Sequence, residues 1–262
     1  MPITTRIPIR RLSQSEFGDI AYEVMEHVFA IHNAIGRFFD ERIYKFELAQ
    51  RLPNVRLEEP VEVKFGSFRT TYALDVLVAD GALFEFKAAE SLVDRHRAQL
   101  LNYLLLCDLA HGKLINVRTI DVQHEFVNTQ WRAAKRRQFA VHSEHWDLKI
   151  PAAAALRDYL TELLHDLGAG LEISLYENVI VHHFGGSEQV QAKVPVWISG
   201  RQVGEQPMRL IAPGVAIKIT GLDRSLGEFE AHARKLLAHV DLKAIAWVNI
   251  NMKEVTFTTL TR

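Results

Sequence analysis

Residues 72–87 read Tyr-Ala-Leu-Asp-Val-Leu-Val-Ala-Asp-Gly-Ala-Leu-Phe-Glu-Phe-Lys, and this stretch decides the fold. Asp80 and Gly81 together are a strong signal for a tight turn, because both residues tolerate positive φ. Apolar residues dominate the two flanking arms, as expected for strands that lie inside a sheet. The stretch therefore predicts a β-hairpin at the centre of a buried sheet.

Three charged residues interrupt this apolar hairpin, namely Asp75, Glu85 and Lys87. Glu85 and Lys87 are two residues apart, so on a strand they point to one face while Phe86 points to the other. Burying two carboxylates and an ammonium group is costly unless they pair or hold a metal. This conflict between charge and burial marks the hairpin as the candidate site.

Helices are expected on both sides of the hairpin in the sequence. Apolar residues recur at helical spacing up to Ile35, where Gly36 ends the first helix, and a second helix is expected over about 40–52. A strand is expected near residues 60–65. A long helix over 89–109 and a short buried strand at 114–117 follow the hairpin. This order predicts an α/β fold, with a mixed sheet and flanking helices.

The composition is that of a soluble globular protein. The 262 residues are 48% apolar and 24% charged, enough for one large domain or two ordinary ones. A formal net charge of −1 gives no overall basic bias, so any polyanion site must be a local patch. The single cysteine, Cys107, excludes an intrachain disulfide and a Cys-rich zinc site. Neither a signal peptide nor a bilayer-spanning run is apparent, so we expect a cytoplasmic protein with no membrane partner.

The second half of the chain repeats the first. Residues 205–250 align with 72–117 without a gap. We expect a first domain at 1–139, a linker at 140–149 and a second copy of the same fold at 150–262. The shared positions include the pairs Gly81/Gly214, Asn116/Asn249, Gly36/Gly168 and Tyr44/Tyr176.

The charged residues of the hairpin are not shared. The aligned pairs are Asp75/Met208, Glu85/Lys218 and Lys87/Thr220. Because the apolar framework persists without these charges, folding does not require them. We interpret them as a site in the first copy that the second, degenerate copy lacks.

Two carboxylates on adjacent strands are suited to a divalent metal. Asp75 and Glu85 would bind Mg²⁺ or Mn²⁺, which prefer oxygen ligands, with the carbonyl of Phe86 and the carboxylate of Glu41 as further ligands. Such a metal polarises a phosphoryl oxygen and acidifies a bound water. Lys87 would orient that water or stabilise charge that develops on a phosphate.

Other residues are candidates for holding a nucleic-acid backbone. Gln99 and Tyr103 are four residues apart and share a helix face suited to positioning a substrate. Tyr44 is a further candidate, although both tyrosines also suit packing, and His96 is a phosphate contact or an exposed helix histidine. A basic cluster near two aromatic residues either binds phosphates or is a solvated helix face. It consists of Lys135, Arg136 and Arg137.

Asp75 followed by Glu85-x-Lys87 resembles the PD-(D/E)XK nuclease superfamily, and Gln99-x-x-x-Tyr103 resembles a motif that follows it there. Residues 31–44 resemble the GxxExxY proteins, in which a glycine-rich turn precedes Glu-x-x-Tyr. Residues 97–103 match the Arg-Ala-Gln-Leu-Leu-x-Tyr helix of that family. The resemblance covers about residues 12–118, and it departs at 36–40, where the family has a second glycine. It implies a divalent-metal nuclease fold with functional residues at Glu41, Asp75, Glu85 and Lys87.

We therefore expect a metal-dependent nuclease with two tandem PD-(D/E)XK-like domains forming a pseudo-dimer, the second degenerate. One intact site should nick one strand, or trim single strands or ends, with DNA favoured over RNA as substrate. The alternative is an inactive nucleic-acid-binding or regulatory protein with the same fold. A third hypothesis is a structural protein whose C-terminal half forms a homodimer or partner interface.

Overall fold

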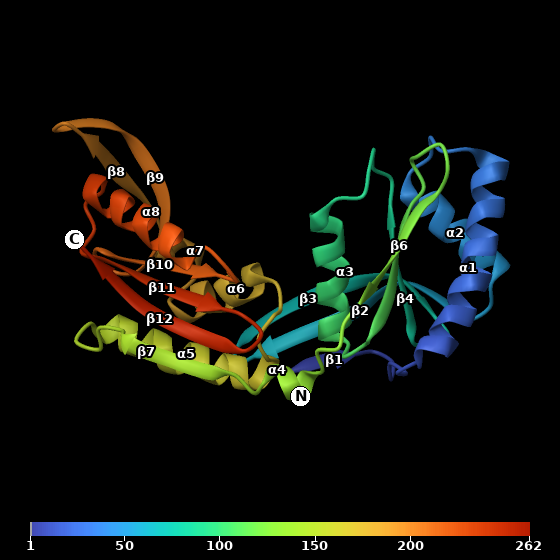
Figure 1. The fold of residues 1–262 in the computed structure, drawn as a ribbon, viewed down its shortest axis with the longest axis horizontal. Coiled ribbons are helices and arrows are strands. Elements are labelled where there is room, and N and C mark those ends of the chain that lie inside the picture. The colour runs from blue at the N-terminus through green and yellow to red at the C-terminus, as the bar shows by residue number, and fades with distance from the viewer. Residues whose placement is uncertain (1) are drawn as a thin grey trace. The chain divides into compact units, whose positions relative to one another are not determined.

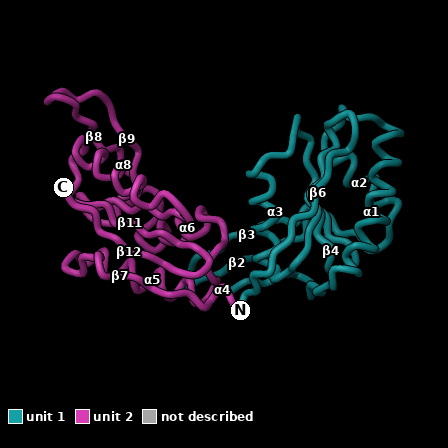
Figure 2. Tube along the Cα trace, viewed as in Figure 1, with its two compact units in different colours: residues 1–133 teal, residues 134–262 magenta. Residues whose placement is uncertain are grey.

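The computed structural model describes residues 2–262, which form two compact units (Figure 1). The first unit covers residues 1–133 and the second covers 134–262 (Figure 2). Each unit contains one six-stranded mixed sheet with helices beside it, so the predicted α/β class is confirmed. No helix in the described part of the chain is long and apolar enough to cross a membrane.

The first unit follows the element order that the sequence predicts, with an extra strand at each end. Its sheet has the order β1-β2-β3-β4-β5-β6, and all neighbours are antiparallel except β4 and β5. Helix α3 makes the crossover that two parallel strands require. The elements are β1 (Ile3–Thr5), α1 (Gln14–Ile35), α2 (Glu41–Arg51), β2 (Val55–Phe65), β3 (Phe68–Val78), β4 (Ala82–Lys87), α3 (Asp94–Leu106), β5 (His111–Asn116) and β6 (Gln123–Asn128).

Helix α1 is defined at both ends by its own residues. The hydroxyl of Ser13 accepts the Glu16 N–H at 3.2 Å, and the Glu16 carboxylate accepts the Ser13 N–H at 2.8 Å, which is a capping box. Gly36 follows the helix with a φ of 77°, and its N–H donates to the carbonyl of His32. This left-handed conformation favours glycine and ends the helix where the sequence predicts.

The turn of the hairpin differs in detail from the expectation. Ala79 and Asp80 have positive φ values of 50° and 54°, whereas Gly81 does not. A Cβ atom at Gly81 would lie 2.4 Å from the backbone oxygen of Arg10. Position 81 therefore requires glycine because a side chain there would collide with the segment that leads into α1. The conformational freedom of glycine is not the reason.

The two arms of the hairpin separate at the charged residues. Strands β3 and β4 pair only at 76–78 and 82–84. Beyond these pairs the carboxylate of Asp75 takes the place of a strand partner, because its Oδ2 accepts the N–H of Phe86 at 2.9 Å. The sheet therefore opens between β3 and β4 at the point where Asp75, Glu85 and Lys87 lie.

The second unit contains a comparable sheet, with the order β7-β12-β11-β10-β9-β8. Helices α5 and α6 precede its long hairpin, and α8 connects its two central parallel strands. The elements are α4 (Ala133–Arg136), β7 (Ala140–His145), α5 (Pro151–Leu167), α6 (Ile173–His183), α7 (Ser187–Val190), β8 (Gln191–Ile198), β9 (Arg201–Ala212), β10 (Val215–Thr220), α8 (Leu226–His239), β11 (Ala244–Ile250) and β12 (Glu254–Thr261).

Five strands have the same order and direction in both units. Strands β2 to β6 and β8 to β12 both run antiparallel, antiparallel, parallel, antiparallel. The parallel pairs also share their register: Phe84 pairs with Lys113 in the first unit, and the aligned Ile217 pairs with Ala246 in the second. The sixth strand differs, since β1 pairs with β2 whereas β7 pairs with β12.

A buried tyrosine fixes the same turn in each unit. The Tyr44 hydroxyl donates to the carbonyl of Gly36 at 2.5 Å, and the Tyr176 hydroxyl donates to that of Gly168 at 2.7 Å. Both tyrosines are buried. Tyr44 thus holds the turn between α1 and α2, and the structure corrects the expectation that it contacts nucleic acid.

A buried asparagine recurs in the same way. The side chain of Asn116 accepts the N–H of Ala89 at 3.1 Å and donates to its carbonyl at 2.8 Å. Asn249 makes the same two hydrogen bonds to Leu222, at 2.8 and 2.9 Å. Each asparagine ties the end of the second parallel strand to the segment that leads into the crossover helix.

The expected linker at 140–149 is wrong. Residues Ala140–His145 form β7, which pairs in parallel with β12 at the edge of the second sheet. The units divide between residues 133 and 134, not after 139. The side chains of β7 are largely exposed, so this edge strand lacks the apolar alternation that would identify it in the sequence.

Candidate active site

The predicted catalytic residues lie together where the hairpin opens. Asp75 projects from β3, and Glu85 and Lys87 project from β4; Asp75 and Glu85 are buried. The Lys87 ammonium donates to Glu85 Oε1 at 2.6 Å. Phe86 donates its N–H to Asp75, and ligation of a metal by its carbonyl stays a prediction.

Glu85 is held in an unfavourable environment. Only 1% of the residue is exposed, and its Oε2 has no hydrogen-bond partner among the described residues. Burial, and then the charge of Asp75, raise the pKa of Glu85 to about 7, although Lys87 acts in the opposite direction. A buried carboxylate oxygen without a partner is costly, and it is also an available ligand for a cation.

The raised pKa of Glu85 predicts a pH dependence of stability in the metal-free protein. Between its ordinary value of 4.5 and about 7, Glu85 binds more protons in the folded state than in the unfolded state. The free energy of unfolding should therefore fall by up to about 3 kcal/mol as the pH rises through this window. Urea unfolding with a chelator at about pH 5 and about pH 8 measures this change.

The Glu85→Gln variant is the matched test, because an amide does not titrate. It should lose most of the difference between the two pH values, while Glu62→Gln, at a half-exposed pair with Lys64 on β2, should retain it. Equal pH dependence in the wild type and Glu85→Gln would contradict the assignment.

Glu41 brings a third carboxylate toward the site. It is the first residue of α2, and its side chain is 35% exposed. Burial, followed by the charge of Asp75, raises the pKa of Glu41. The charge of Asp75 thus acts on Glu41, and ligation of a metal by Glu41 stays a prediction.

Lys45 is a central residue of the site that the sequence analysis missed. It is 3% exposed, and its ammonium donates to Asp75 Oδ1 at 2.8 Å and to Glu58 Oε1 at 2.5 Å. Glu41 lies 4.0 Å from the same ammonium. Burial lowers the pKa of Lys45, but its bonds to Asp75 and Glu58 outweigh burial and raise it. Lys45 is thus the counter-ion of Asp75.

Glu58 reaches the site through an irregularity in β2. Its neighbours Leu57 and Glu59 both pair with β3, whereas Glu58 is skipped in the register and has a φ of 53°. The register is unchanged on both sides of Glu58, so only the pairing with Asp75 opposite it is missing, and the carboxylate of Glu58 accepts a hydrogen bond from the Lys45 ammonium. The sequence gives no distinct signal for this role, because β2 also contains the charged residues Arg56, Glu62 and Lys64.

The chemistry of the candidate donors suits a divalent cation. Glu41, Asp75 and Glu85 offer carboxylate oxygens, the ligands that Mg²⁺ and Mn²⁺ prefer. In residues 2–262, however, no group of three or more His, Cys, Asp or Glu side chains is gathered closely enough to hold a metal ion. Lys45 and Lys87 instead neutralise Asp75 and Glu85. A metal would have to take the place of the Lys45 ammonium on Asp75.

Gln99 and Tyr103 lie on the side of the site that α3 covers. The Gln99 amide donates to the Tyr103 hydroxyl at 3.1 Å, and the Tyr103 ring packs edge-on against Tyr72. Burial raises the pKa of Tyr103, with smaller contributions from the charges of Glu85 and Asp75. The pair thus lies near the carboxylates, and its contact with a substrate stays a prediction.

His96 has a local structural role. The residue is buried, and its Nδ1 accepts the N–H of Val93 at 3.3 Å, which caps the start of α3. Burial, followed by the charge of Lys87, lowers the pKa of His96. His96 is thus a buried residue and not the exposed helix histidine of the second interpretation, and its contact with phosphate stays a prediction.

The predicted basic cluster does not form one surface. Arg136 is fully buried and donates to the carbonyl of Ala169 at 2.8 Å. Arg137 is exposed but donates to the carbonyl of Asp166 at 3.0 Å, and Lys135 is exposed. The nucleic-acid contact expected of Arg136 is therefore wrong, because this guanidinium is part of the core of the second unit.

The second unit does not reproduce the carboxylate set. Met208, Lys218 and Thr220 stand at the aligned positions. The Thr220 hydroxyl donates to the side chain of Asn249, and the side chain of Lys218 is exposed. No pair comparable to Glu85 and Lys87 occurs on β10.

One ion pair does recur, with its charges reversed. Glu177 on α6 aligns with Lys45 through the shared tyrosines, and it accepts a bond from Arg209 on β9 at 3.0 Å. Arg209 is one residue beyond the position of Asp75. A helix-to-strand ion pair thus belongs to the fold of both units, and Asp75 has a structural role in addition to any catalytic one.

Residues 18–129 match the family model described as the PD-(D/E)XK nuclease superfamily. No curated protein and no solved structure matches the chain. The matched residues include all of the elements that carry Glu41, Asp75, Glu85 and Lys87. The finer resemblance to GxxExxY proteins stays a prediction. Within the first unit, residues 18–129 are thus similar to the PD-(D/E)XK nuclease superfamily.

Proposed function

We propose that the chain is a divalent-metal-dependent nuclease whose catalytic residues are Asp75, Glu85 and Lys87. The observation that carries the proposal is the buried, unpartnered oxygen of Glu85, which lies beside an ammonium group where the hairpin opens. A sheet would not keep such an atom for stability alone. The superfamily match over residues 18–129 supports phosphodiester hydrolysis as the class of reaction.

Each residue of the site has a distinct part in this proposal. The Phe86 N–H fixes one oxygen of Asp75, which leaves Oδ1 as the ligand atom. Glu85 and Glu41 supply the other oxygens. A bound divalent cation would polarise a phosphoryl oxygen and acidify a water. The ammonium of Lys87, held at the site by Glu85, would donate to a phosphate oxygen as its charge develops.

The second unit is proposed to be a degenerate copy of the first. Its five shared strands, its Tyr176 and its Asn249 support a common fold, and its lack of the carboxylate set supports loss of the site. A chain with one site cuts one strand at a time. We therefore propose that it nicks duplex DNA, or trims single strands or ends.

Supercoiled plasmid incubated with Mg²⁺ or Mn²⁺ tests this proposal. The nicked circle should accumulate before any linear product, because one site has to cut twice, independently, to linearise a duplex. Gel electrophoresis over time measures the two products. Glu85→Gln should remove the activity, whereas Glu62→Gln on β2 should leave it intact.

Two outcomes would overturn the proposal. Linear product without a nicked intermediate would show two coupled sites. Equal cleavage by the wild type and Glu85→Gln would show that the cleaving group lies elsewhere. Parallel reactions on single-stranded DNA and RNA identify the substrate class.

An inactive nucleic-acid-binding protein is the second candidate, favoured by the lysines that already neutralise the site. Lys45 holds Asp75 and Lys87 holds Glu85, so the carboxylates are internally compensated. Nucleic-acid binding without cleavage of any substrate, in either metal, supports this candidate over the nuclease.

A further inference from the structure

Exposed aromatic side chains gather at the junction of α1 and α2. Phe38 is 76% exposed, Phe39 is 45% exposed and Phe46 is 53% exposed. Phe38 and Phe39 directly precede Asp40, the N-cap of α2, and Asp40 is about 9 Å from Phe46 along the helix axis. Single exposed rings need no explanation, but a group of three on one short segment marks an interaction surface.

Arginine side chains lie against these rings. The Arg37 guanidinium is 5.0 Å from the centre of the Phe38 ring, and that of Arg42 is 5.8 Å from the centre of the Phe46 ring. Arg118 donates to the backbone carbonyl of Phe38 at 3.4 Å. Cation and ring thus alternate on this surface, as in proteins that bind bases and phosphates together.

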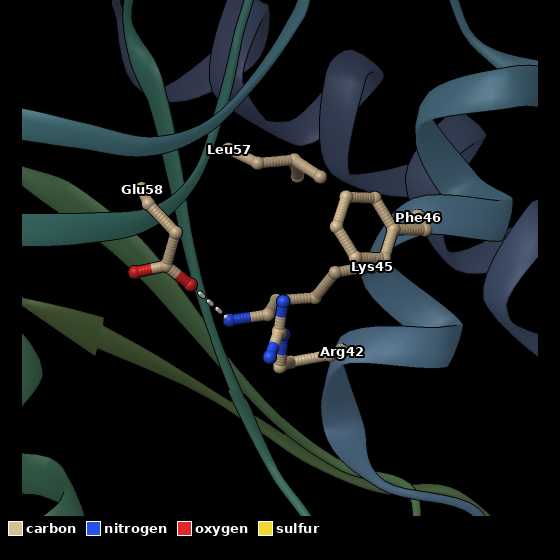
Figure 3. Close-up of a pocket in the computed structure, with 5 residues that line it drawn as sticks. All are labelled: Arg42, Lys45, Phe46, Leu57 and Glu58. Carbon is tan, nitrogen blue, oxygen red and sulfur yellow. Dashed lines mark hydrogen bonds and ion pairs between the residues drawn. The ribbon is translucent and has the colours of Figure 1, made fainter.

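Two residues of this surface, Arg42 and Phe46, also adjoin the candidate active site. Arg42 and Phe46 line a pocket of about 310 Å³ together with Lys45, Leu57 and Glu58 (Figure 3). Figure 3 shows Lys45 reaching across this pocket from α2 to Glu58. The same lysine holds Asp75, so the pocket adjoins the carboxylates that would hold the metal.

We propose that Arg37, Phe38, Phe39, Arg42 and Phe46, here called the aromatic–arginine surface, bind single-stranded nucleic acid. Unpaired bases would stack on the rings, and the arginines would hold phosphates. The backbone would then run past the start of α2 toward the carboxylates. Bases in a duplex already stack on one another and offer no free faces, so the surface selects single strands. The inference rests on the proposed function for the direction of the strand, but its test does not require cleavage.

Fluorescence anisotropy with a chelator present tests binding apart from catalysis. The probes are fluorescein-labelled single-stranded DNA, single-stranded RNA and duplex DNA of equal length, about 20 nucleotides. The full-length wild type should bind single strands more tightly than duplex. The triple variant Phe38→Ala/Phe39→Ala/Phe46→Ala should bind single strands at least about tenfold more weakly.

Tyr22→Ala is the matched control. Tyr22 is 78% exposed on the same helix, α1, about 20 Å along its axis from Ile35, and it should leave binding unchanged. All three rings of the variant are exposed, so its unfolding curve should match that of the wild type. A second variant, Arg42→Gln, removes one cation without removing a ring, and it should weaken binding and lower its salt dependence.

The outcomes separate this inference from the proposed nuclease. Binding that depends on the three rings, without cleavage in any metal, supports the surface and opposes the nuclease. Cleavage together with unchanged binding in the triple variant overturns the surface alone. A change in self-association by sedimentation velocity, with no change in nucleic-acid binding, also overturns it, since the rings would then form a protein interface. Comparison of the single-stranded DNA and RNA probes shows which of the two nucleic acids the surface binds more tightly.

Discussion

We expect the Lys87→Met variant to cleave about a hundred- to a thousandfold more slowly than the wild type at saturating metal. Methionine keeps much of the length and apolar stem of lysine but removes the ammonium that lies 2.6 Å from Glu85. A group that stabilises charge developing in the transition state contributes to the rate and not to substrate binding. Single-turnover cleavage measures the loss directly.

Removal of this ammonium also affects Glu85. The charge of Lys87 opposes the raised pKa of Glu85, so that pKa should rise further in the variant. Metal binding would then weaken near pH 7, which is why the rate has to be measured at several Mn²⁺ concentrations. A variant whose full rate returns at high Mn²⁺ would contradict a role of Lys87 in the chemical step.

Lys64→Met is the control for lost charge. Lys64 pairs with Glu62 on β2 at 2.6 Å, and both side chains are half-exposed. An exposed pair of this kind contributes little to stability, and it lies away from the hairpin opening. Its replacement should therefore leave the cleavage rate within about twofold of the wild type.

The repeat was the most informative signal in the sequence. A gap-free alignment of 205–250 with 72–117 predicts a common register, and β4–β5 and β10–β11 have that register. Apolar alternation and the length of the crossover helix encode this pairing locally. The edge strand β7 has neither signal, which is why the sequence predicts a linker there.

The same repeat identifies Tyr44 as structural. A tyrosine that packs and a tyrosine that binds a ligand look alike in one sequence. Tyr44, however, recurs as Tyr176 in the unit without the carboxylate set, and both hydroxyls bind the carbonyl of the preceding turn glycine. A residue that recurs in a unit without the carboxylate set serves the fold, and this comparison could have removed Tyr44 from the predicted site.

Lys45 could not be found in this way. Its role depends on contacts with Glu58 and with Asp75, thirty residues away, at a local irregularity of β2 that has no periodic signal. The reversed pair Glu177–Arg209 also limits the inference from the repeat that the fold does not require the charges of the hairpin. Glu85 and Lys87 have no counterpart in the second unit, whereas the ion pair of Asp75 has one. The case for a site is therefore strongest at β4.

The Lys45→Met variant is expected to lose about 3–5 kcal/mol of the free energy of unfolding in the metal-free protein. Lys45 is the counter-ion of Asp75 and the partner of Glu58, and its removal leaves the buried Asp75 charge without a cation. The Phe86 N–H remains bonded to Asp75, which should keep the loss from being larger. Urea unfolding with a chelator present measures the change.

Saturating Mn²⁺ should restore much of the free energy of unfolding that Lys45→Met loses. A ligand that binds only the folded state stabilises it by an amount that grows with the ratio of its concentration to its Kd. In the wild type a metal has to displace the Lys45 ammonium from Asp75, whereas in Lys45→Met that oxygen is vacant. Isothermal titration calorimetry should therefore show tighter Mn²⁺ binding by Lys45→Met than by the wild type, by about tenfold or more.

Arg209→Met is the matched control, because it breaks the equivalent ion pair in the second unit. Arg209 pairs with Glu177 at 3.0 Å, so its removal should also destabilise the protein. No carboxylate set surrounds that pair, and Mn²⁺ should not compensate for its loss. If Mn²⁺ stabilised both variants equally, or left the deficit of Lys45→Met unchanged, the metal would not occupy the place of the Lys45 ammonium. A divalent cation that selectively rescues Lys45→Met would locate the metal at Asp75 without any measurement of cleavage.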